Sequence, residues 1–165
     1  MTTELHLLRH AHAGDPAKWR GADFDRPLST KGREQATRLG AFLAATGFAP
    51  DAIVTSPRIR ALQTAEIVAE RLGVTWRVDD RLADPLSAAT VERILADAGD
   101  TSRPVLVGHD PGFSELVRLL TGATRIAMRK GAIARIDVER PLTWGEGALR
   151  WLLPPDLIPD VGRAG

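Results

Sequence analysis

Short strand-like segments alternate with longer helical segments along most of this chain. Six mostly apolar segments have the length of buried strands: 4–9, 52–55, 74–78, 105–107, 132–138 and 148–153. Four longer segments are predicted helices: 29–47, 56–73, 89–98 and 111–120. Strands that alternate with helices of this length form a mostly parallel sheet with helices on both faces. We therefore predict an α/β fold, a three-layer α/β/α sandwich around a mostly parallel central sheet.

Turn and capping residues mark the boundaries of the first two helices. Ser29 is a typical N-cap, and the apolar stripe that follows it stops at Gly47. Pro57 suits the first position of the second helix, whose stripe stops at Gly73. The chain has no repeat, linker or low-complexity tract, so we predict a single domain over 1–165 with an ordered core at about 4–155.

The composition excludes several classes of protein. The 165 residues are 44% hydrophobic and 26% charged, which is typical of a globular domain. A net charge of +1 argues against a nucleic-acid partner, and no apolar run approaches the ~20 residues of a membrane span. The absence of cysteine removes disulfides, thiolate catalysis and thiolate metal sites. The first residues lack the pattern of a secretory signal. We expect a cytoplasmic protein without membrane contact.

Basic and imidazole side chains follow several of the predicted strands. Arg9 and His10 end the first strand, Arg60 lies just after the second, and His109 follows the strand at 105–107. Ligands of such sheets bind beyond the carboxyl ends of the strands. Arginine forks bind phosphate oxygens in bidentate geometry, and the N-terminus of the helix after His109 favours an anion. These residues predict a phosphate site at one edge of the sheet.

Four motifs carry a resemblance to a known family. They are, in order, "LLRHAHAG" (7–14), "RPLSTKGREQA" (26–36), "SPRIRALQTA" (56–65) and "VGHDPGFSEL" (107–116). In order and spacing the chain resembles the histidine phosphatase superfamily, which includes the phosphoglycerate mutases. The short length, "RKGAIARIDVE" (129–139) and "LRWLLPP" (149–155) look most like the SixA-type phosphohistidine phosphatases. The resemblance covers residues 4–155.

This resemblance implies specific roles for the residues that match. His10 would be the nucleophile that accepts the phosphoryl group, while Arg9, Arg60 and His109 would bind and polarise its oxygens. Arg26 matches an arginine that helps to hold the phosphate in the SixA-type branch. The chemistry agrees with these roles, because phosphoryl transfer needs mainly charge stabilisation and in-line positioning. Neighbouring guanidinium groups should also keep the His10 imidazole neutral and nucleophilic.

The proton donor to the leaving group is less clearly marked. Many members of the superfamily place a carboxylic acid after the third strand for this purpose. Asp84 is the nearest candidate here, with Asp79 and Asp80 as alternatives, although the surrounding sequence departs from the mutase pattern. SixA-type proteins also lack a clear donor at this place.

Other interpretations of the same residues remain open. His10, His12 and His109 could form a metal cluster, but metal sites favour histidines backed by carboxylates, and the neighbours here are arginines. We therefore expect no metal and no cofactor. His12 is either a rim residue or a substrate contact, and the loop at 18–20 is either a binding rim or a solvated loop. A non-catalytic module that only binds phosphate is the alternative from another class.

The length of the chain bears on the substrate. The 48 residues between Arg60 and His109 must supply the rest of a helix, a strand and another helix, which leaves little for a lid. An open pocket admits a phosphorylated side chain of a folded partner, whereas enzymes acting on small esters benefit from closure. The resemblance also implies phosphohistidine. We expect a phosphohistidine-bearing protein domain as the substrate, with a small phosphomonoester as the alternative.

Overall fold

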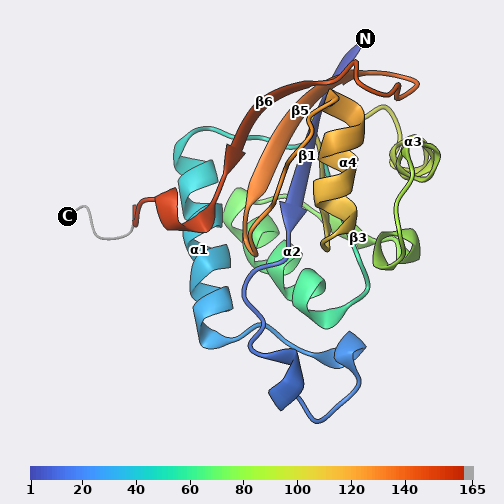
Figure 1. Cartoon of the computed structure of the whole chain (residues 1–165). Coiled ribbons are helices and arrows are strands. Elements are labelled where there is room, and N and C mark those ends of the chain that lie inside the picture. The colour runs from blue at the N-terminus through green and yellow to red at the C-terminus, as the bar shows by residue number, and fades with distance from the viewer. Residues whose placement is uncertain (162–165) are drawn as a thin grey trace.

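The computed structural model describes residues 1–161 and contains one six-stranded sheet with helices on both faces (Figure 1). Residues 162–165 of the predicted domain lie outside the described residues. The strands are β1 (Thr2–Arg9), β2 (Ala52–Thr55), β3 (Trp76–Val78), β4 (Pro104–Gly108), β5 (Ile133–Glu139) and β6 (Ala148–Leu153). The helices are α1 (Thr30–Ala45), α2 (Ile59–Leu72), α3 (Ala88–Asp97) and α4 (Gly112–Thr121). Four short 3₁₀ turns complete the order: η1 (Pro16–Lys18), η2 (Asp23–Asp25), η3 (Asp80–Ala83) and η4 (Pro155–Leu157).

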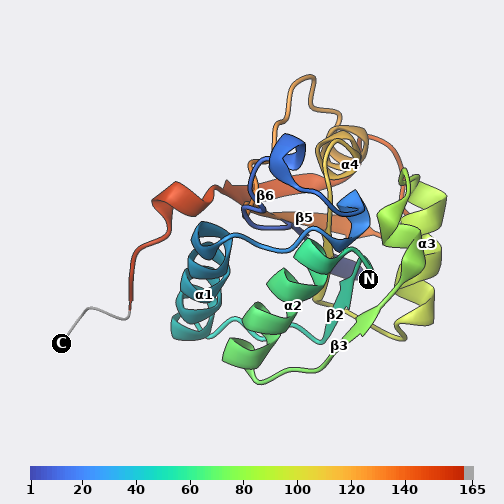
Figure 2. The same ribbon diagram turned by 90° about the horizontal axis from the view of Figure 1, so that it is seen from below.

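The sheet is mostly parallel, as predicted. Its strand order is β3-β2-β4-β1-β5-β6. The first four strands in this order pair in parallel, while β5 runs antiparallel to both β1 and β6. Helices α1 and α2 cover one face and α3 and α4 the other, which confirms the three-layer sandwich (Figure 2).

Strand β1 shows why the buried strands carry little polar alternation. Leu5 and Leu7 pack into the core formed with α3 and α4, and Leu8 packs into the core formed with α1 and α2. Both faces of the strand are therefore buried, as is usual for strands in parallel sheets.

Helix α2 begins at Ile59, two residues after the first helical position predicted at Pro57. The backbone N–H of Ser56 donates to Val107 at 2.9 Å and so extends the pairing of β2 with β4 by one residue. Pro57 disfavours helical geometry at the residue before it, and Arg58 is the extended N-cap of the helix. The predicted end is confirmed, because Gly73 terminates α2 with a left-handed φ of 67°.

The segment after β6 packs against the α1 and α2 side of the sheet. Ile158 is 4% exposed and belongs to the core on that face, although the sequence places it beyond the expected ordered core. Within residues 1–161, none of the helices combines the length and the apolar character needed to cross a membrane.

Candidate active site

The register of β1, β2 and β4 brings three functional side chains to one edge of the sheet. Arg9 pairs with Gly108, and Thr55 pairs with Val107. The residues that follow these strands therefore leave the sheet at nearly the same level: His10 after β1, Ser56 after β2 and His109 after β4. The His10 backbone N–H continues this pattern and donates to the Gly108 carbonyl at 2.9 Å. The loop at 11–29, with η1 and η2, lies beyond this edge (Figure 1).

His10 is buried, and one of its ring nitrogens is held by the backbone. Nδ1 lies 2.7 Å from the Ala11 carbonyl oxygen. A carbonyl only accepts hydrogen bonds, so Nδ1 carries the proton and Nε2 carries the lone pair. The His10 pKa is lowered to about 3, mainly by burial and also by the neighbouring His109, Arg60 and Arg9. The neutral form predicted from the arginines is correct, but burial is its larger cause.

His109 lies beside His10, with ring centroids 5.3 Å apart. Its Nε2 forms a 2.7 Å hydrogen bond with the Ser56 hydroxyl, and its Nδ1 is buried with no hydrogen-bond partner among the described residues. Burial lowers the pKa of His109 to about 3, with help from Arg60 and Arg58. Ser56 Oγ accepts the Arg58 backbone N–H at 3.3 Å, so its own proton can be donated to Nε2. That arrangement leaves a proton on Nδ1, which is a free donor.

Arg9 is held by a closed ring of three hydrogen bonds and one ion pair. Its Nη1 donates to the Met128 carbonyl at 2.6 Å, and the Met128 N–H donates to Ser114 Oγ at 3.0 Å. Ser114 Oγ donates to Asp110 at 2.7 Å, and Asp110 lies 3.6 Å from Arg9 Nη1. The Nε atom of Arg9 is buried without a hydrogen-bond partner among residues 1–161. The ring fixes the guanidinium and leaves one of its donors available.

Arg60 lies in the first turn of α2 and is 6% exposed. Its two terminal nitrogens bind Asp23: Nη1 donates to the carbonyl at 2.7 Å and Nη2 to the carboxylate at 3.0 Å. Its Nε is buried, and no described residue accepts a hydrogen bond from it. Thr64 ties this turn to the loop after His10, because its hydroxyl donates to the Arg60 carbonyl and accepts the Ala11 N–H.

Asp23 was not predicted, yet it organises three arginines. Its carboxylate contacts Arg26 at 2.9 Å, Arg60 at 3.0 Å and Arg58 at 3.3 Å. The hydrogen bond from Arg26 is the largest cause that holds the Asp23 pKa below its usual value. Arg26 is itself buried, and its Nη1 donates to the Ala13 carbonyl at 2.7 Å. Arg26 therefore anchors the 11–29 loop beside the site and acts on Arg60 through Asp23.

Asp84 lies on the same side of the site as His109. It is exposed and lines a cavity of about 340 Å³ together with Arg58, Arg60 and His109. The alternative donor Asp79 is instead the N-cap of η3 and is paired with Arg81 at 2.6 Å. The position of Asp84 is compatible with proton donation, and its role stays a prediction.

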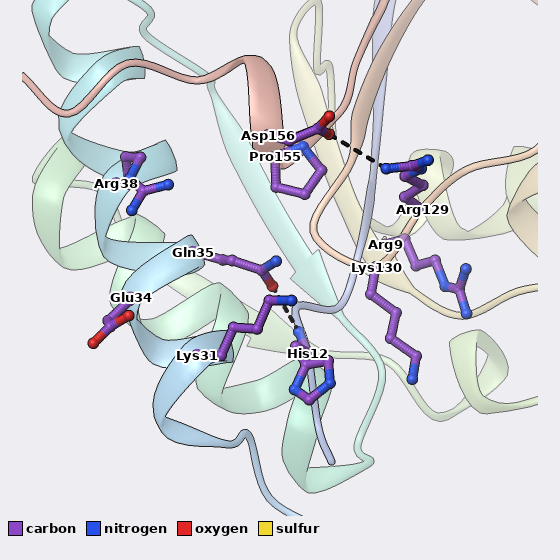
Figure 3. Close-up of a pocket in the computed structure, with 10 residues that line it drawn as sticks. All are labelled: Arg9, His12, Lys31, Glu34, Gln35, Arg38, Arg129, Lys130, Pro155 and Asp156. Carbon is purple, nitrogen blue, oxygen red and sulfur yellow. Dashed lines mark hydrogen bonds and ion pairs between the residues drawn. The ribbon is translucent and has the colours of Figure 1, made fainter. Parts of the chain in front are cut away.

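His12, Arg129 and Lys130 line a second cavity on the other side of Arg9 (Figure 3). His12 Nδ1 forms a 2.6 Å hydrogen bond with Ser29 Oγ, and Gln35 accepts its backbone N–H at 2.9 Å. Burial and the nearby Lys130 and Lys31 lower the pKa of His12. Residues 18–20 are exposed, and Lys18 lines a separate shallow hollow with Arg26. His12 is therefore a residue of this cavity wall.

Among residues 1–161, no group of three or more histidine, aspartate or glutamate side chains is placed to hold a metal ion. The structure instead gathers His10, Arg9, Arg60 and His109, which we call the histidine–arginine cluster.

The sequence analysis did not identify two residues that contact this cluster, Ser56 and Asp23. Ser56 is the first residue of the motif at 56–65 and directly follows β2, so its place at the edge of the sheet could have been predicted. Asp23 lies in a loop whose path the sequence pattern does not reveal.

Known proteins resemble this chain in both sequence and fold. A sequence model of the histidine phosphatase superfamily (branch 1) matches residues 5–86. An uncharacterised protein of Picosynechococcus sp. is 36% identical, over 92% of this chain and 99% of its own length. A 2,3-bisphosphoglycerate-dependent phosphoglycerate mutase of Arthrobacter sp. is 30% identical over 70% of this chain, which spans 57% of the mutase.

A solved structure with a similar fold is that of the protein histidine phosphatase SixA complexed with tungstate. It has a TM-score of 0.80 and 24% sequence identity, and covers 94% of this chain and 98% of its own. The predicted SixA-type fold is thereby confirmed.

Proposed function

Because this chain belongs to the histidine phosphatase superfamily, we propose that it is a phosphatase that works through a phosphohistidine at His10 and acts on protein-borne phosphohistidine. One observation carries the proposal. The free Nε2 of His10 lies in a cluster whose Arg9 Nε, Arg60 Nε and His109 Nδ1 are all buried without a partner among the described residues. Buried nitrogen donors are nearly always paired in native proteins. We take a phosphoryl group, an oxyanion with several acceptor atoms, as the partner that such donors would bind.

The cluster supports a displacement in two steps. In the first, the Nε2 lone pair of His10 forms a bond to phosphorus while the bond from phosphorus to the leaving group breaks. Arg9 and Arg60 neutralise the charge on the phosphoryl oxygens, and the neutral His109 donates a hydrogen bond. In the second step, water attacks phosphorus and the P–N bond breaks, which releases phosphate and restores the His10 lone pair. No step requires a metal or a cofactor.

The weak placement of Asp84 favours phosphohistidine over an alkyl ester as the substrate. Asp84 is exposed, and its carboxylate forms no hydrogen bond or ion pair with a described residue, so nothing fixes the carboxyl group as a donor. An alkoxide needs a well-placed proton donor, whereas the nitrogen of a phosphoramidate departs readily once protonated. A weakly placed acid therefore suits phosphohistidine. A cytoplasmic location, where such a partner would be met, stays a prediction.

A small phosphomonoester is the second candidate, and the similarity to a mutase supports it. The test compares kcat/KM on a phosphohistidine-bearing phosphotransfer domain with kcat/KM on a panel of sugar and glycerate phosphates. We expect the protein substrate to be preferred. A preference of a hundredfold or more for any small ester would overturn the proposed substrate and leave the His10 mechanism standing. A chain that binds phosphate but turns over none of these compounds would be the non-catalytic module.

A further inference from the structure

The cavity on the far side of Arg9 from His109 carries a concentrated positive charge. Its volume is about 570 Å³, within the usual range for a small-ligand site. Five of the side chains that line it are cationic: Arg9, Lys31, Arg38, Arg129 and Lys130. We call it the basic cavity. Two carboxylates also line it, so its excess of three positive charges exceeds the net charge of +1 of the whole chain.

The carboxylates of the basic cavity do not neutralise its lysines. Asp156 lies 3.7 Å from Arg129 and pairs with that residue. Glu34 lies on α1 and points away from Lys130 (Figure 3). Lys31 and Lys130 are two of the three lysines of the chain, and both line this cavity. Neither forms an ion pair with any residue in 1–161. Two ammonium groups are therefore available for an anion.

Both walls of the basic cavity are fixed to the strand end that carries His10. On one side the Gly131 N–H donates to the Arg9 and His10 carbonyls at 3.1 and 2.9 Å, which holds Lys130 beside β1. Gly131 adopts a φ of +81°, a conformation that glycine tolerates best, so this turn is specified by its sequence.

On the other side the first turn of α1 packs closely against His12. A Cβ atom on Gly32 would lie 1.9 Å from the His12 carbonyl oxygen, and Ser29 donates its backbone N–H to the same oxygen. Lys31 lies between Ser29 and Gly32 in the sequence, and its side chain faces the cavity (Figure 3). The backbone that carries each lysine is thus held in place before any ligand arrives, which reduces the backbone part of the entropic cost of binding.

The charges also act on one another across the cavity. Lys130 and Lys31 both lower the pKa of His12, which lies between the two walls. Partial burial lowers the pKa of Lys130, as do Arg9, Arg26 and Arg60. Lys130 therefore lies within electrostatic reach of the histidine–arginine cluster, and Arg9 belongs to both sites. A ligand that contacts Arg9 therefore lies beside the basic cavity.

We infer that the basic cavity binds a second anionic group of the substrate, a carboxylate or a phosphate, through Lys31 and Lys130. This inference rests on the proposed function, because the first anionic group is the phosphoryl group at the histidine–arginine cluster. The second group belongs either to a small molecule with two anionic ends or to an acidic residue that flanks the phosphorylated side chain of a protein. Both sources present the same chemistry to the two lysines.

The test measures binding by calorimetry, so that it does not depend on turnover. The probes are ω-carboxyalkylphosphonates of increasing chain length, each compared with the alkylphosphonate of the same length. We expect the best carboxylated probe to bind about tenfold more tightly than its partner, the gain of one charge-assisted contact. Lys31→Gln and Lys130→Gln should each remove most of this gain and weaken alkylphosphonate binding by a much smaller factor. Arg93→Gln, an exposed charge on α3, is the matched control and should keep the gain.

A second arm distinguishes the two sources. Peptides that carry a non-hydrolysable phosphohistidine mimic are compared with aspartate or alanine beside the mimic. A gain confined to the aspartate peptide, and lost in Lys130→Gln, assigns the basic cavity to an acidic protein partner. A gain confined to the small probes assigns it to a small molecule. Absence of any gain in both arms, or a gain that persists in the Lys31→Gln, Lys130→Gln double variant, overturns the inference. Failure of the plain alkylphosphonates to bind at all would instead overturn the phosphoryl site itself.

Discussion

Two buried histidines of the same chain, His6 within β1 and His10 just beyond it, have nearly the same electrostatic state. Burial is the largest cause that lowers their pKa values, to about 4 for His6 and about 3 for His10. His6 is 1% exposed and contacts two aromatic rings, Phe48 at 4.8 Å and Trp151 at 5.7 Å between centroids. His10 is 5% exposed and contacts the ring of His109.

The difference between the two histidines lies in their neighbours and their position along the strand. His6 is enclosed in the sheet, where Arg135 and Glu4 act on it with opposite sign. His10 lies at the carboxyl edge, where Arg9 and Arg60 provide positive charge and unpaired donors. A neutral buried imidazole is thus not sufficient for reactivity. The cationic neighbours at the sheet edge distinguish the candidate nucleophile from a core residue.

The largest expected effect is the loss of activity on removal of the nucleophile. His10→Ala should reduce turnover of an activated aryl phosphate by at least about a thousandfold, because no other group replaces the attacking nitrogen. The fold should persist, since the side chain lies at the end of β1 and outside the two main cores. Steady-state kinetics and circular dichroism check the two parts. Unchanged turnover in a folded variant would remove His10 from the mechanism.

Arg60→Gln should have the next largest effect. Loss of one preorganised charge contact to the transferring group lowers kcat by roughly 10²–10³ at comparable sites. The measurement is kcat on the same aryl phosphate, with Arg93→Gln as a control that removes an exposed charge on α3. A loss of tenfold or less would place Arg60 outside direct contact with the phosphoryl group.

Asp84→Asn tests the proton donor through the choice of substrate. If Asp84 protonates the leaving group, the variant should slow alkyl phosphates by about a hundredfold and aryl phosphates, which need little protonation, far less. Equal small effects on both would leave Asp84 as a structural residue of the loop. Its exposed position leads us to expect a smaller difference on phosphohistidine than on alkyl esters.

Ser56→Ala tests whether the Ser56 hydroxyl positions His109. Loss of the 2.7 Å hydrogen bond should lower kcat/KM by about fivefold, in line with about 1 kcal/mol for one buried hydrogen bond, and should alter the His109 ring signals in NMR spectra. Ser87→Ala is the matched control, because the Ser87 hydroxyl caps α3 and forms no hydrogen bond with the histidine–arginine cluster. That control should lower stability by about 1 kcal/mol without changing kcat/KM.

The smallest effect on activity is expected for His6, which completes the comparison. His6→Leu should change kcat/KM by less than twofold. The unfolded chain binds a proton at His6 below pH 6.5, whereas the folded chain does so only near pH 4. This residue therefore adds stability above pH 6.5 that is lost as the pH falls toward 4. Its removal should decrease the slope of stability against pH by about 1.4 kcal/mol per pH unit in that window. Urea unfolding at several pH values measures the slope, and an unchanged slope would contradict the neutral assignment.

The fold was largely predictable from local sequence, because strand length, helical spacing and capping residues such as Ser29 and Gly73 are local signals. Arg9, His10 and His109 were predictable as neighbours because parallel strands end at one edge. Asp23 was not, because its contacts with Arg26, Arg58 and Arg60 depend on the path of an irregular loop. The start of α2 was misplaced for a similar reason, since strand pairing to β4 overrides the helical preference at Ser56 and Pro57.

The central claim is that the Nε2 nitrogen of His10 accepts the phosphoryl group. The most direct measurement is rapid quenching of the protein with a radiolabelled aryl phosphate, followed by peptide mapping under alkaline conditions that preserve phosphohistidine. We predict one acid-labile phosphoryl group on Nε2 of His10, formed and discharged at rates no slower than turnover. Its absence during turnover, or a label on any other residue, would contradict the account.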